Sequence, residues 1–265
     1  MTSPETTIRD RVQVVSLMPD VLDHAKAIDR VLQLAGAKKG GYVCFSTVHM
    51  VMESYDSPKF GARVNDADMI VTDGMPLVWM QRLQGKSDAV RIRANDLMIM
   101  LCRHAADNNI SVGFYGGQQV VLDAIRERAK RDFPDLNIVY AYSPPFRPLT
   151  ADEDEKITNE INAAAPDILF MGLGCPKQEN WMAAHREKLT AVMLGVGASF
   201  DFFAGNVRES PEWMGRLGLE WLYRLTQEPK RLWRRYLILN PRFMWLALQQ
   251  LAGLKKVDTA RQRRN

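Results

Sequence analysis

The chain has 265 residues, and its hydrophobic content of 46% and charged content of 25% are ordinary for a globular protein with a sizeable core. No run approaches the roughly 18–20 uninterrupted apolar residues that span a bilayer, and the polar N-terminus lacks the apolar core of a signal peptide. Three widely separated cysteines argue against a disulfide framework and a zinc cluster, so a cytoplasmic, reducing compartment is expected.

The net charge of +4 is unevenly distributed along the chain. Residues 221–265 contain 11 Lys and Arg against 2 Asp and Glu, a net charge of +9, whereas residues 1–220 carry a net charge of −5. Half of the six tryptophans also lie in this basic segment. A basic, aromatic tail beside an acidic body favours an anionic partner, such as a phosphate group, an anionic lipid or a nucleic acid.

In chain order, short apolar runs alternate with helical patterns. Nearly continuous apolar runs are typical of parallel strands that are buried on both faces. The pattern predicts a doubly wound, mainly parallel, Rossmann-like α/β sheet of six or seven strands. The predicted strands are residues 11–17, 41–47, 69–74, 110–117, 137–143, 167–174 and 190–197. The predicted helices are residues 19–37, 48–66, 97–106, 118–133 and 178–189.

Ligands of such sheets bind outside the carboxyl ends of the strands, so the residues that follow each strand are the site candidates. Asp73, which closes a strand beside Gly74, is the leading candidate. A carboxylate there can act as a general base or hold a ribose hydroxyl, but it can equally cap the next helix. His49 also follows a strand and is a candidate ligand contact.

Two further strand ends are polar or glycine-rich. Gly116 and Gly117 open a helix, where backbone N–H groups can approach a phosphate, although a tight strand-to-helix turn explains the glycines equally well. In the stretch GLGCPKQEN, the amide of Gln178 suits hydrogen bonding to a sugar or a base because it both donates and accepts. Cys175 has no identifiable histidine partner, so a nucleophilic role is not indicated.

Arginines are the expected phosphate ligands. Arg91 or Arg93, ahead of a predicted helix, can bind a diphosphate, and Asp96 can orient that arginine; a solvated loop pair is the alternative. No paired-acid metal motif stands out, and the acids of residues 66–68 precede a strand, at the wrong edge for the site, where they are expected to be solvated. No metal is therefore expected.

Several stretches together resemble one family, the WecG/TagA/CpsF glycosyltransferases, in the family's order and over roughly residues 10–240. The stretches are STVHMVMES, NDADMIVTDGMPLVW, RIRAND, FYGG, DILFMGLGCPKQE, GVGASFDFFAG and GLEWLYRLTQEPKRLWRRY. The resemblance implies an inverting, metal-independent glycosyltransferase with a UDP-sugar donor and no other cofactor. The transferred sugar would be of the N-acetylmannosamine type, its uronic acid or a hexose. The acceptor would be a saccharide on a polyprenyl diphosphate at the inner face of the cell membrane, in teichoic acid or other surface polysaccharide synthesis.

The same resemblance implies roles for individual residues. Asp73 would be the base, and Arg91, Thr47 and Gln178 would contact substrate. The tail arginines of the pattern are Arg224, Arg231 and Arg234. Two departures bear on acceptor details: Ala94 stands where the family has glycine, and residues 208–211 replace an R-A-P element.

The tail is expected to have two roles. Pro229 suits the first turn of a helix, from which Arg231 and Arg234 fall on one side and Arg235 faces elsewhere. We expect Arg224, Arg231 and Arg234 to close over the diphosphate, and the tail to lie on an anionic membrane surface as an interfacial helix. The expected lipid contacts are Trp233, Tyr236, Phe243 and Trp245. The chain thus divides into an α/β catalytic core, residues 1–205, and a helical appendage, residues 206–265.

The residues are also compatible with an inverting mechanism on chemical grounds. Inversion needs one general base opposite the leaving group, whereas retention needs a second, nearby carboxylate nucleophile, and the sequence shows no clear one. A Rossmann-type oxidoreductase is disfavoured because residues 14–20, VVSLMPD, carry no glycine fingerprint. A nucleic-acid-binding protein and a non-catalytic membrane adaptor, each using the basic tail, are two competing hypotheses. No nucleic-acid partner is expected for the transferase, and a homo-oligomer is left open.

Overall fold

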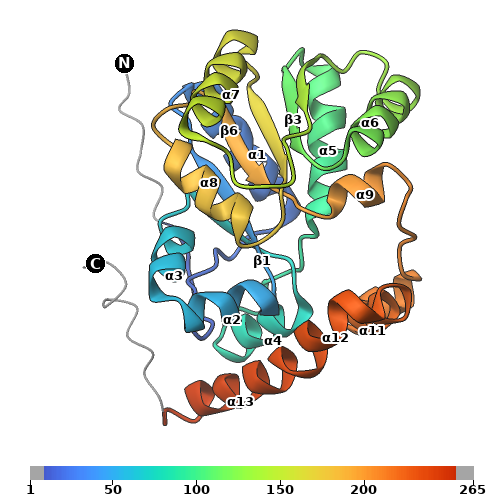
Figure 1. The fold of residues 1–265 in the computed structure, drawn as a ribbon. Coiled ribbons are helices and arrows are strands. Elements are labelled where there is room, and N and C mark those ends of the chain that lie inside the picture. Colours follow the sequence, from blue (N-terminus) through green and yellow to red (C-terminus); the bar gives the residue numbers. More distant parts are fainter. Residues whose placement is uncertain (1–8, 255–265) are drawn as a thin grey trace.

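The computed structural model describes residues 9–254, and within them six strands form one fully parallel sheet in the order β2-β1-β6-β5-β3-β4. The doubly wound α/β fold that the sequence predicts is therefore confirmed (Figure 1). The strands are β1 (Tyr42–Ser46), β2 (Met69–Thr72), β3 (Val112–Gly116), β4 (Ile138–Tyr142), β5 (Ile168–Gly172) and β6 (Val192–Gly195).

Helices cover both faces of the sheet, because successive side chains of each strand point to opposite faces and both sets are apolar. In β1, for example, Val43 and Phe45 belong to one core, whereas Tyr42 and Cys44 belong to the other. The first face is covered by α1 (His24–Ala37), α5 (Ala94–Asp107), α6 (Gln119–Asp132) and α9 (Ser199–Phe203). The second is covered by α2 (Val48–Asp56), α3 (Pro58–Asn65), α7 (Ala151–Ala164) and α8 (Lys177–His185).

The strand predicted at residues 11–17 is wrong. Val14 and Leu17 exchange backbone hydrogen bonds, and Val15 between them has a φ of 55°, so the chain reverses within four residues. The apolar side chains of Val14, Val15 and Leu17 are nevertheless fully buried, which explains why their pattern resembled a strand. The helix predicted from residue 19 begins only at His24, where the Asp23 carboxylate accepts the backbone N–H of Lys26.

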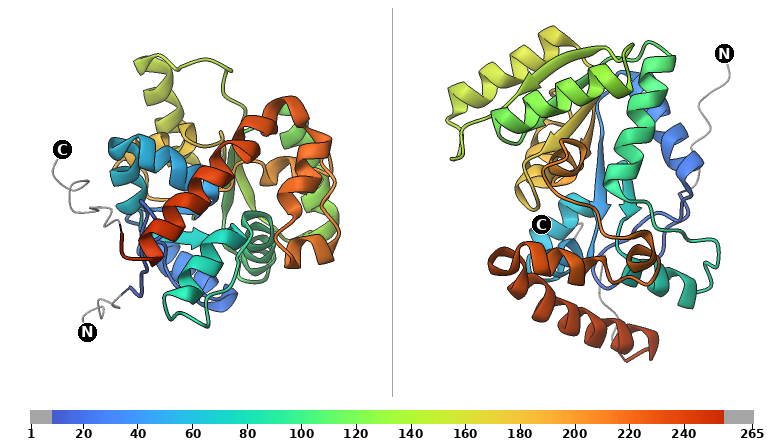
Figure 2. Two further views of the ribbon diagram at one scale, coloured as in Figure 1. Left: turned by 90° about the horizontal axis from the view of Figure 1, so that it is seen from below. Right: turned by 90° about the vertical axis from the view of Figure 1, so that its right-hand side faces the viewer.

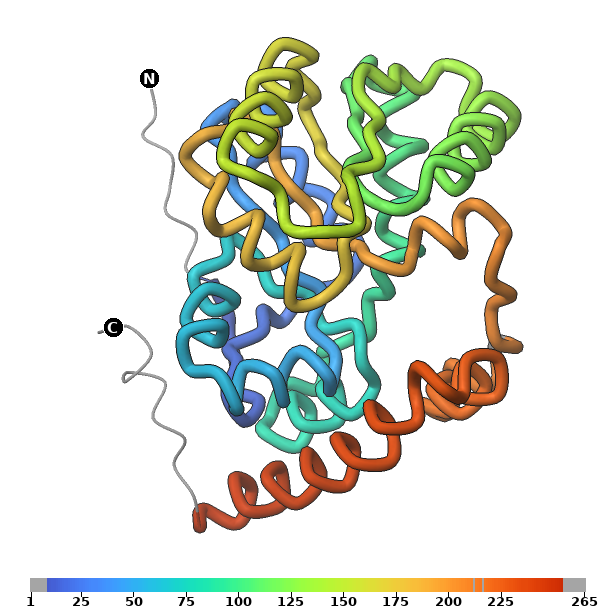
Figure 3. Tube along the Cα trace, in the orientation of Figure 1, coloured from blue at the N-terminus to red at the C-terminus, as the bar shows by residue number. Residues whose placement is uncertain are grey.

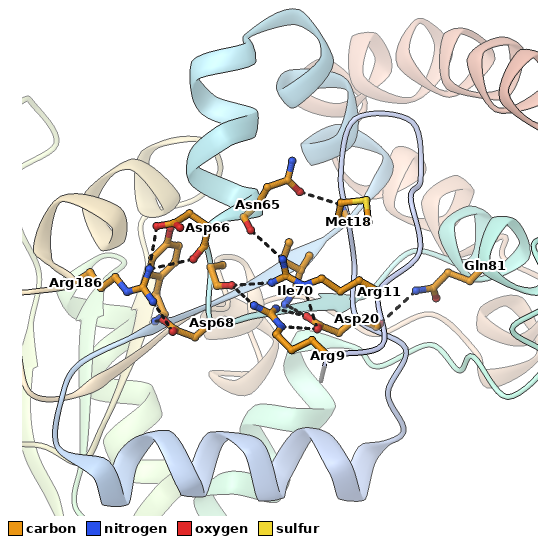
Figure 4. A network of polar contacts seen from close by, with 12 residues as sticks. Arg9, Arg11, Met18, Asp20, Asn65, Asp66, Asp68, Ile70, Gln81 and Arg186 are labelled. Atoms are coloured by element: carbon orange, nitrogen blue, oxygen red, sulfur yellow. Dashed lines mark hydrogen bonds and ion pairs between the residues drawn. The ribbon is translucent and has the colours of Figure 1, made fainter. Parts of the chain in front are cut away.

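A polar network anchors the N-terminal segment at the amino edge of the sheet, opposite the strand ends where ligands are expected (Figure 4). Asp20 accepts two hydrogen bonds from the guanidinium of Arg9 and one from the backbone N–H of Ile70. Arg186 forms ion pairs with Asp66 and Asp68. The expectation that these acids are solvated is wrong for Asp68, whose side chain is only 17% exposed.

The remaining helices are α4 (Met75–Leu83), α10 (Glu212–Arg216), α11 (Glu220–Gln227), α12 (Pro229–Leu237) and α13 (Leu239–Leu251). The last three run as an arc below the carboxyl edge of the sheet (Figures 1 and 3), and the view from below shows α12 and α13 crossing beneath the core (Figure 2). Among the residues that the structure describes, no helix combines the length and hydrophobicity needed to cross a membrane.

Helix α13 packs against α2 through Phe243, Leu246 and Ala247, which are buried in the core of the second face. Phe243 is fully buried, so its predicted contact with lipid is wrong. Trp245 is 63% exposed, as a residue two positions further along a helix should be when Phe243 faces inward.

Replacement of Phe243 by alanine should therefore destabilise the fold by about 3–5 kcal/mol, because a buried ring is lost and a cavity remains. Replacement of the exposed Trp245 by alanine should change the free energy of unfolding by less than about 1 kcal/mol. Urea unfolding of the two full-length variants measures both values, and equal losses would contradict the packing of α13.

Candidate active site

Asp73 follows β2 directly, at the carboxyl edge of the sheet. Its backbone N–H donates to the carbonyl of Ser46, so the residue is fixed to the end of β1. Gly74 caps α4 without a side-chain bond, which shows that Asp73 does not cap that helix. Its carboxylate accepts from the backbone N–H of Ala94, at the start of α5, at 3.4 Å and from Arg91 at 3.5 Å.

Burial raises the pKa of the Asp73 carboxyl above its usual value. Arg91 opposes this shift by attraction, and the nearby Glu220 adds to it by repulsion. A carboxylate with a raised pKa binds a proton more tightly than an exposed one, so it is a better general base in its ionised form. The environment of Asp73 therefore suits proton abstraction.

Arg91 joins the strand end to the tail. Its Nε donates to the backbone carbonyl of Asp73 at 2.6 Å, and its Nη2 donates to the Glu220 carboxylate of α11 at 2.7 Å. Burial opposes the charge of Glu220, but the attraction of Arg91 and Arg93 outweighs it and lowers the pKa of Glu220. These ion pairs hold α11 against the edge of the sheet, beside Asp73.

Arg93 and Asp96 are neighbours of this cluster. Arg93 pairs with Glu209 at 2.9 Å and with Asp96 at 3.4 Å, so Asp96 orients Arg93 rather than Arg91. Asn95 also donates to Glu209. Sequence reasoning missed Glu209 and Glu220, because both reach the site from distant segments and no local pattern marks them.

The three tail arginines expected at the diphosphate lie in different surroundings. The guanidinium of Arg224 stands 5.2 Å from the ring centre of Phe202, and its buried Nε has no hydrogen-bond partner among the described residues. Arg231 is exposed and pairs with Glu228. Arg234 is also exposed and lines a cleft between α2 and α12. Of these three, Arg224 is the least exposed, and the phosphate-binding role of each stays a prediction.

Arg235, which was expected to face elsewhere, points toward the core. It donates to the hydroxyl of Thr47 at 3.4 Å, and its burial lowers the pKa of the guanidinium below its usual value. The reason lies in the register of α12: Leu232, which is 2% exposed, fixes the inner face, and Arg235 follows it by three residues.

Thr47 and His49 lie at the start of α2, which Thr47 caps by accepting the backbone N–H of Met50. Burial lowers the pKa of His49 to about 4, and the positive charge of Arg235 contributes to this shift. The ring is therefore neutral near pH 7. Its Nε2 lies 3.4 Å from Glu53, and its buried Nδ1 has no partner among the described residues.

The amide of Gln178 is buried and committed to the protein itself. It accepts from the backbone N–H of Gly174 and donates to the carbonyl of Gly195 and to Glu179. Gln178 therefore ties the loop after β5 to the end of β6. A direct contact with substrate stays a prediction.

The glycines after β3 are explained by close packing of the backbone. A Cβ on Gly116 would lie 2.6 Å from the carbonyl carbon of Gly172, and both Gly116 and Gly117 have positive φ values. The N–H of Gly117 donates to Gly172, and its carbonyl accepts from Ser143. The turn accounts for both glycines, and their phosphate-binding role stays a prediction.

Glu179 is a feature that sequence reasoning missed, because burial of an acid beside a glutamine has no local signature. It is fully buried, and its Oε2 has no hydrogen-bond partner among the described residues. Burial raises the pKa of this carboxyl to about 7. Burial also raises the pKa of the adjacent Cys175, with Glu179 adding to the shift, so this cysteine is a thiol near pH 7.

Glu179 should make the stability depend on pH. Its pKa rises from 4.5 to about 7 on folding, so the folded state retains the proton and is stabilised below pH 4.5 relative to higher pH. This stabilisation is lost as the pH rises to 7, by about 3 kcal/mol at most. The neutral variant Glu179→Gln should therefore gain stability relative to the wild type between pH 5 and pH 8.

Urea unfolding of both proteins at the two pH values measures this change. The exposed Glu187, in the turn that follows α8, provides the control, because Glu187→Gln should show the same stability difference at both pH values. A constant difference for Glu179→Gln would contradict the assignment.

The carboxyl edge of the sheet therefore brings together the partly buried carboxylate of Asp73, two arginines of the core and the basic helices of the tail. In doubly wound α/β folds, ligands bind at this edge of the sheet, so these residues are the candidates for substrate binding and proton transfer. A family model described as "Glycosyl transferase WecG/TagA/CpsF family" matches residues 12–257. The chain belongs to this family and is a glycosyltransferase. The hypotheses of an oxidoreductase and of a non-catalytic adaptor are therefore wrong.

Relatives with an assigned name are similar over most of their length. The chain is 34% identical over 212 residues, 80% of each chain, to a protein of Bacillus spizizenii, and 31% identical over 188 residues, 71% of each chain, to one of Bacillus subtilis. A protein of Staphylococcus aureus is 32% identical over 194 residues, 73% of this chain and 74% of its own. All three are named N-acetylglucosaminyldiphosphoundecaprenol N-acetyl-beta-D-mannosaminyltransferase.

Proposed function

We propose that this protein transfers N-acetylmannosamine from a UDP-sugar to a polyprenyl-diphosphate-linked N-acetylglucosamine, in the synthesis of a bacterial surface polysaccharide of the teichoic acid type. The observation that carries the proposal is the partly buried Asp73 carboxylate held beside Arg91 at the strand ends. The names of the relatives favour N-acetylmannosamine over its uronic acid or a hexose. They also specify a β linkage, which inversion of an α-linked nucleotide sugar produces.

In the proposed reaction, Asp73 takes the proton from the acceptor hydroxyl while that oxygen attacks C1 of the donor sugar. The bond between C1 and the UDP oxygen breaks, and the diphosphate leaves with its electrons. Arg91 and Arg224 bind the donor diphosphate and stabilise the developing charge, as permanently charged guanidinium groups can. Glu220, the nearby second carboxylate, is held by Arg91 and Arg93, so a single displacement with inversion is favoured.

Metal independence is part of the proposal and rests on these arginines. Among the described residues, no group of three or more His, Cys, Asp or Glu side chains lies close enough together to hold a metal ion. Turnover should therefore be insensitive to EDTA. A requirement for added Mg²⁺ or Mn²⁺ would contradict this part.

We also propose a peripheral position on the inner face of the cell membrane, with residues 1–205 as catalytic core and residues 206–265 as membrane-binding appendage. Residues 1–8 and 255–265 of these two parts lie outside the described structure. Support comes from large apolar side chains that α12 and α13 expose next to their arginines. These are Trp233, Leu237, Met244, Trp245 and Leu248, with the exposed Ile238 between the two helices.

The double variant Trp233→Ser, Trp245→Ser should bind anionic phospholipid vesicles at least about tenfold more weakly than the wild type, because both exposed indole rings are lost. Sedimentation with vesicles measures the loss. Val120→Ser, which changes an exposed residue of α6, is the control and should bind normally. Unchanged binding of the double variant would contradict the membrane role of α12 and α13.

The central experiment is a panel of UDP-sugars with a short-chain lipid diphosphate that carries N-acetylglucosamine, with release of UDP as the signal. UDP-N-acetylmannosamine should give release that depends on the acceptor, and the uronic acid and glucose donors should give little. Preference for another donor would correct the sugar. No acceptor-dependent release with any donor would contradict the proposed function.

A further inference from the structure

A cleft of about 470 Å³ separates α2 from α12. Its charged lining consists of Arg231, Arg234 and Arg235 from α12 against a single acid, Glu53 from α2. Arg231 is already paired with Glu228, so Arg234 and Arg235 supply the available positive charge. The cleft therefore has the charge of an anion-binding site.

Arg235 makes the strongest case for an anionic ligand. No ion pair of the described part of the chain involves Arg235 or Arg234, and the hydrogen bond from Arg235 to Thr47 is long, at 3.4 Å. A guanidinium that is largely removed from water without a counter-ion costs free energy, which an anion in the cleft would offset. His49 lies on the opposite wall of the cleft and is neutral near pH 7, so it adds no positive charge of its own.

One side of the cleft is apolar. Ile238, directly after α12, and Leu239, at the start of α13, line it, and Ile238 is 48% exposed. A ligand with an anionic head and a hydrocarbon tail fits both parts of this surface. A nucleotide would need polar partners for its ribose and base, which Ile238 and Leu239 on this side cannot provide.

The cleft is adjacent to the catalytic carboxylate. Thr47, the hydrogen-bond partner of Arg235, lies against Gly74, since a Cβ built on Gly74 would be 3.6 Å from the Thr47 Cα atom. Asp73 immediately precedes this glycine. A diphosphate bound at Arg235 would therefore place a sugar attached to it next to the proposed base.

We propose that this cleft binds the diphosphate of the lipid-linked acceptor, with Arg234 and Arg235 as its cationic contacts, while the donor diphosphate binds separately at Arg91 and Arg224. The proposal rests on the proposed function and deepens it. It differs from the sequence-based assignment, which placed Arg231 and Arg234 on the donor. The two substrates would then approach Asp73 from different sides, the acceptor from the membrane-facing side of α12.

The test compares Arg235→Gln and Arg234→Gln with Arg242→Gln, a control arginine of α13 that is paired with Asp56. Each of the first two changes should raise the KM for the short-chain lipid acceptor by roughly 10- to 100-fold, as expected for loss of a hydrogen bond to a charged group. The Kd for UDP, measured by calorimetry, should stay within about threefold of the wild type. Arg235→Lys should recover part of the acceptor affinity.

A second measurement does not depend on turnover. Farnesyl diphosphate, a lipid diphosphate without a sugar, should bind the full-length protein in the presence of saturating UDP, and Arg235→Gln should weaken this binding by a similar factor. Competition between farnesyl diphosphate and UDP, or equal loss of UDP affinity in Arg235→Gln, would overturn the assignment. If the wild type transfers sugar normally and both cleft variants keep the wild-type KM for the acceptor, the cleft is not the acceptor site, although the proposed function would stand. A wild type that transfers no sugar would instead contradict the proposed function.

Discussion

Replacement of Asp73 by asparagine should lower kcat by about 10²–10⁴-fold, the usual contribution of a general base. Asparagine keeps the size of the side chain, and its single oxygen can still accept from one of the two donors, Arg91 or the backbone N–H of Ala94. The fold and the affinity for UDP should therefore change little. Initial rates of UDP release at saturating donor and acceptor measure the effect.

Asp66→Asn is the matched control, because Asp66 is an exposed carboxylate at the opposite edge of the sheet, where it pairs with Arg186. It should turn over at the wild-type rate. If Asp73→Asn retained more than a tenth of the wild-type kcat, Asp73 would not be the base, and its position at the strand end would have a structural purpose only.

Arg91→Gln should lower kcat/KM by about 10²–10³-fold, the range found when one donor to a developing negative charge is removed. Affinity for UDP should fall as well, because the same guanidinium is proposed to bind the leaving diphosphate. This variant needs a control because Arg91 also holds α11 through Glu220, so the substitution removes both the guanidinium and this ion pair.

Glu220→Gln provides this control, because it breaks the same ion pair but leaves the arginine free. We expect this variant to keep its affinity for UDP and to lose less activity than Arg91→Gln. Equal losses of UDP affinity in the two variants would show that UDP binding depends on the ion pair between Arg91 and α11. That result would contradict the role of the Arg91 guanidinium as a phosphate ligand. Calorimetry with UDP separates the two cases.

The sheet could be predicted from sequence because five of its six strands are apolar and almost wholly buried on both faces, and the half-buried edge strand β4 is also apolar, which leaves a clear local pattern. Residues 11–17 show the limit of that pattern, since a tight reversal at Val15 buries the same side chains as a strand would. The spacing of apolar residues indicates which side chains are buried, but in a short segment it cannot distinguish a strand from a tight chain reversal.

The site was predictable where its residues follow strands, as Asp73, Thr47 and His49 do. It was not predictable where the contacts are long-range. Glu220 reaches Arg91 from 129 positions further along the chain, and Arg235 reaches Thr47 from 188 positions further. The direction of Arg235 depends on which face of α12 is buried, and several apolar side chains of this helix could have formed that face.

The anomeric configuration of the product tests whether Asp73 acts as the single base of a direct displacement. The wild-type protein would be supplied with α-linked UDP-N-acetylmannosamine and the short-chain acceptor, and the new linkage assigned by NMR. Because a single displacement inverts the α linkage of the donor, we expect a β-linked product. An α-linked product would require a second nucleophile in the site and would contradict the mechanism.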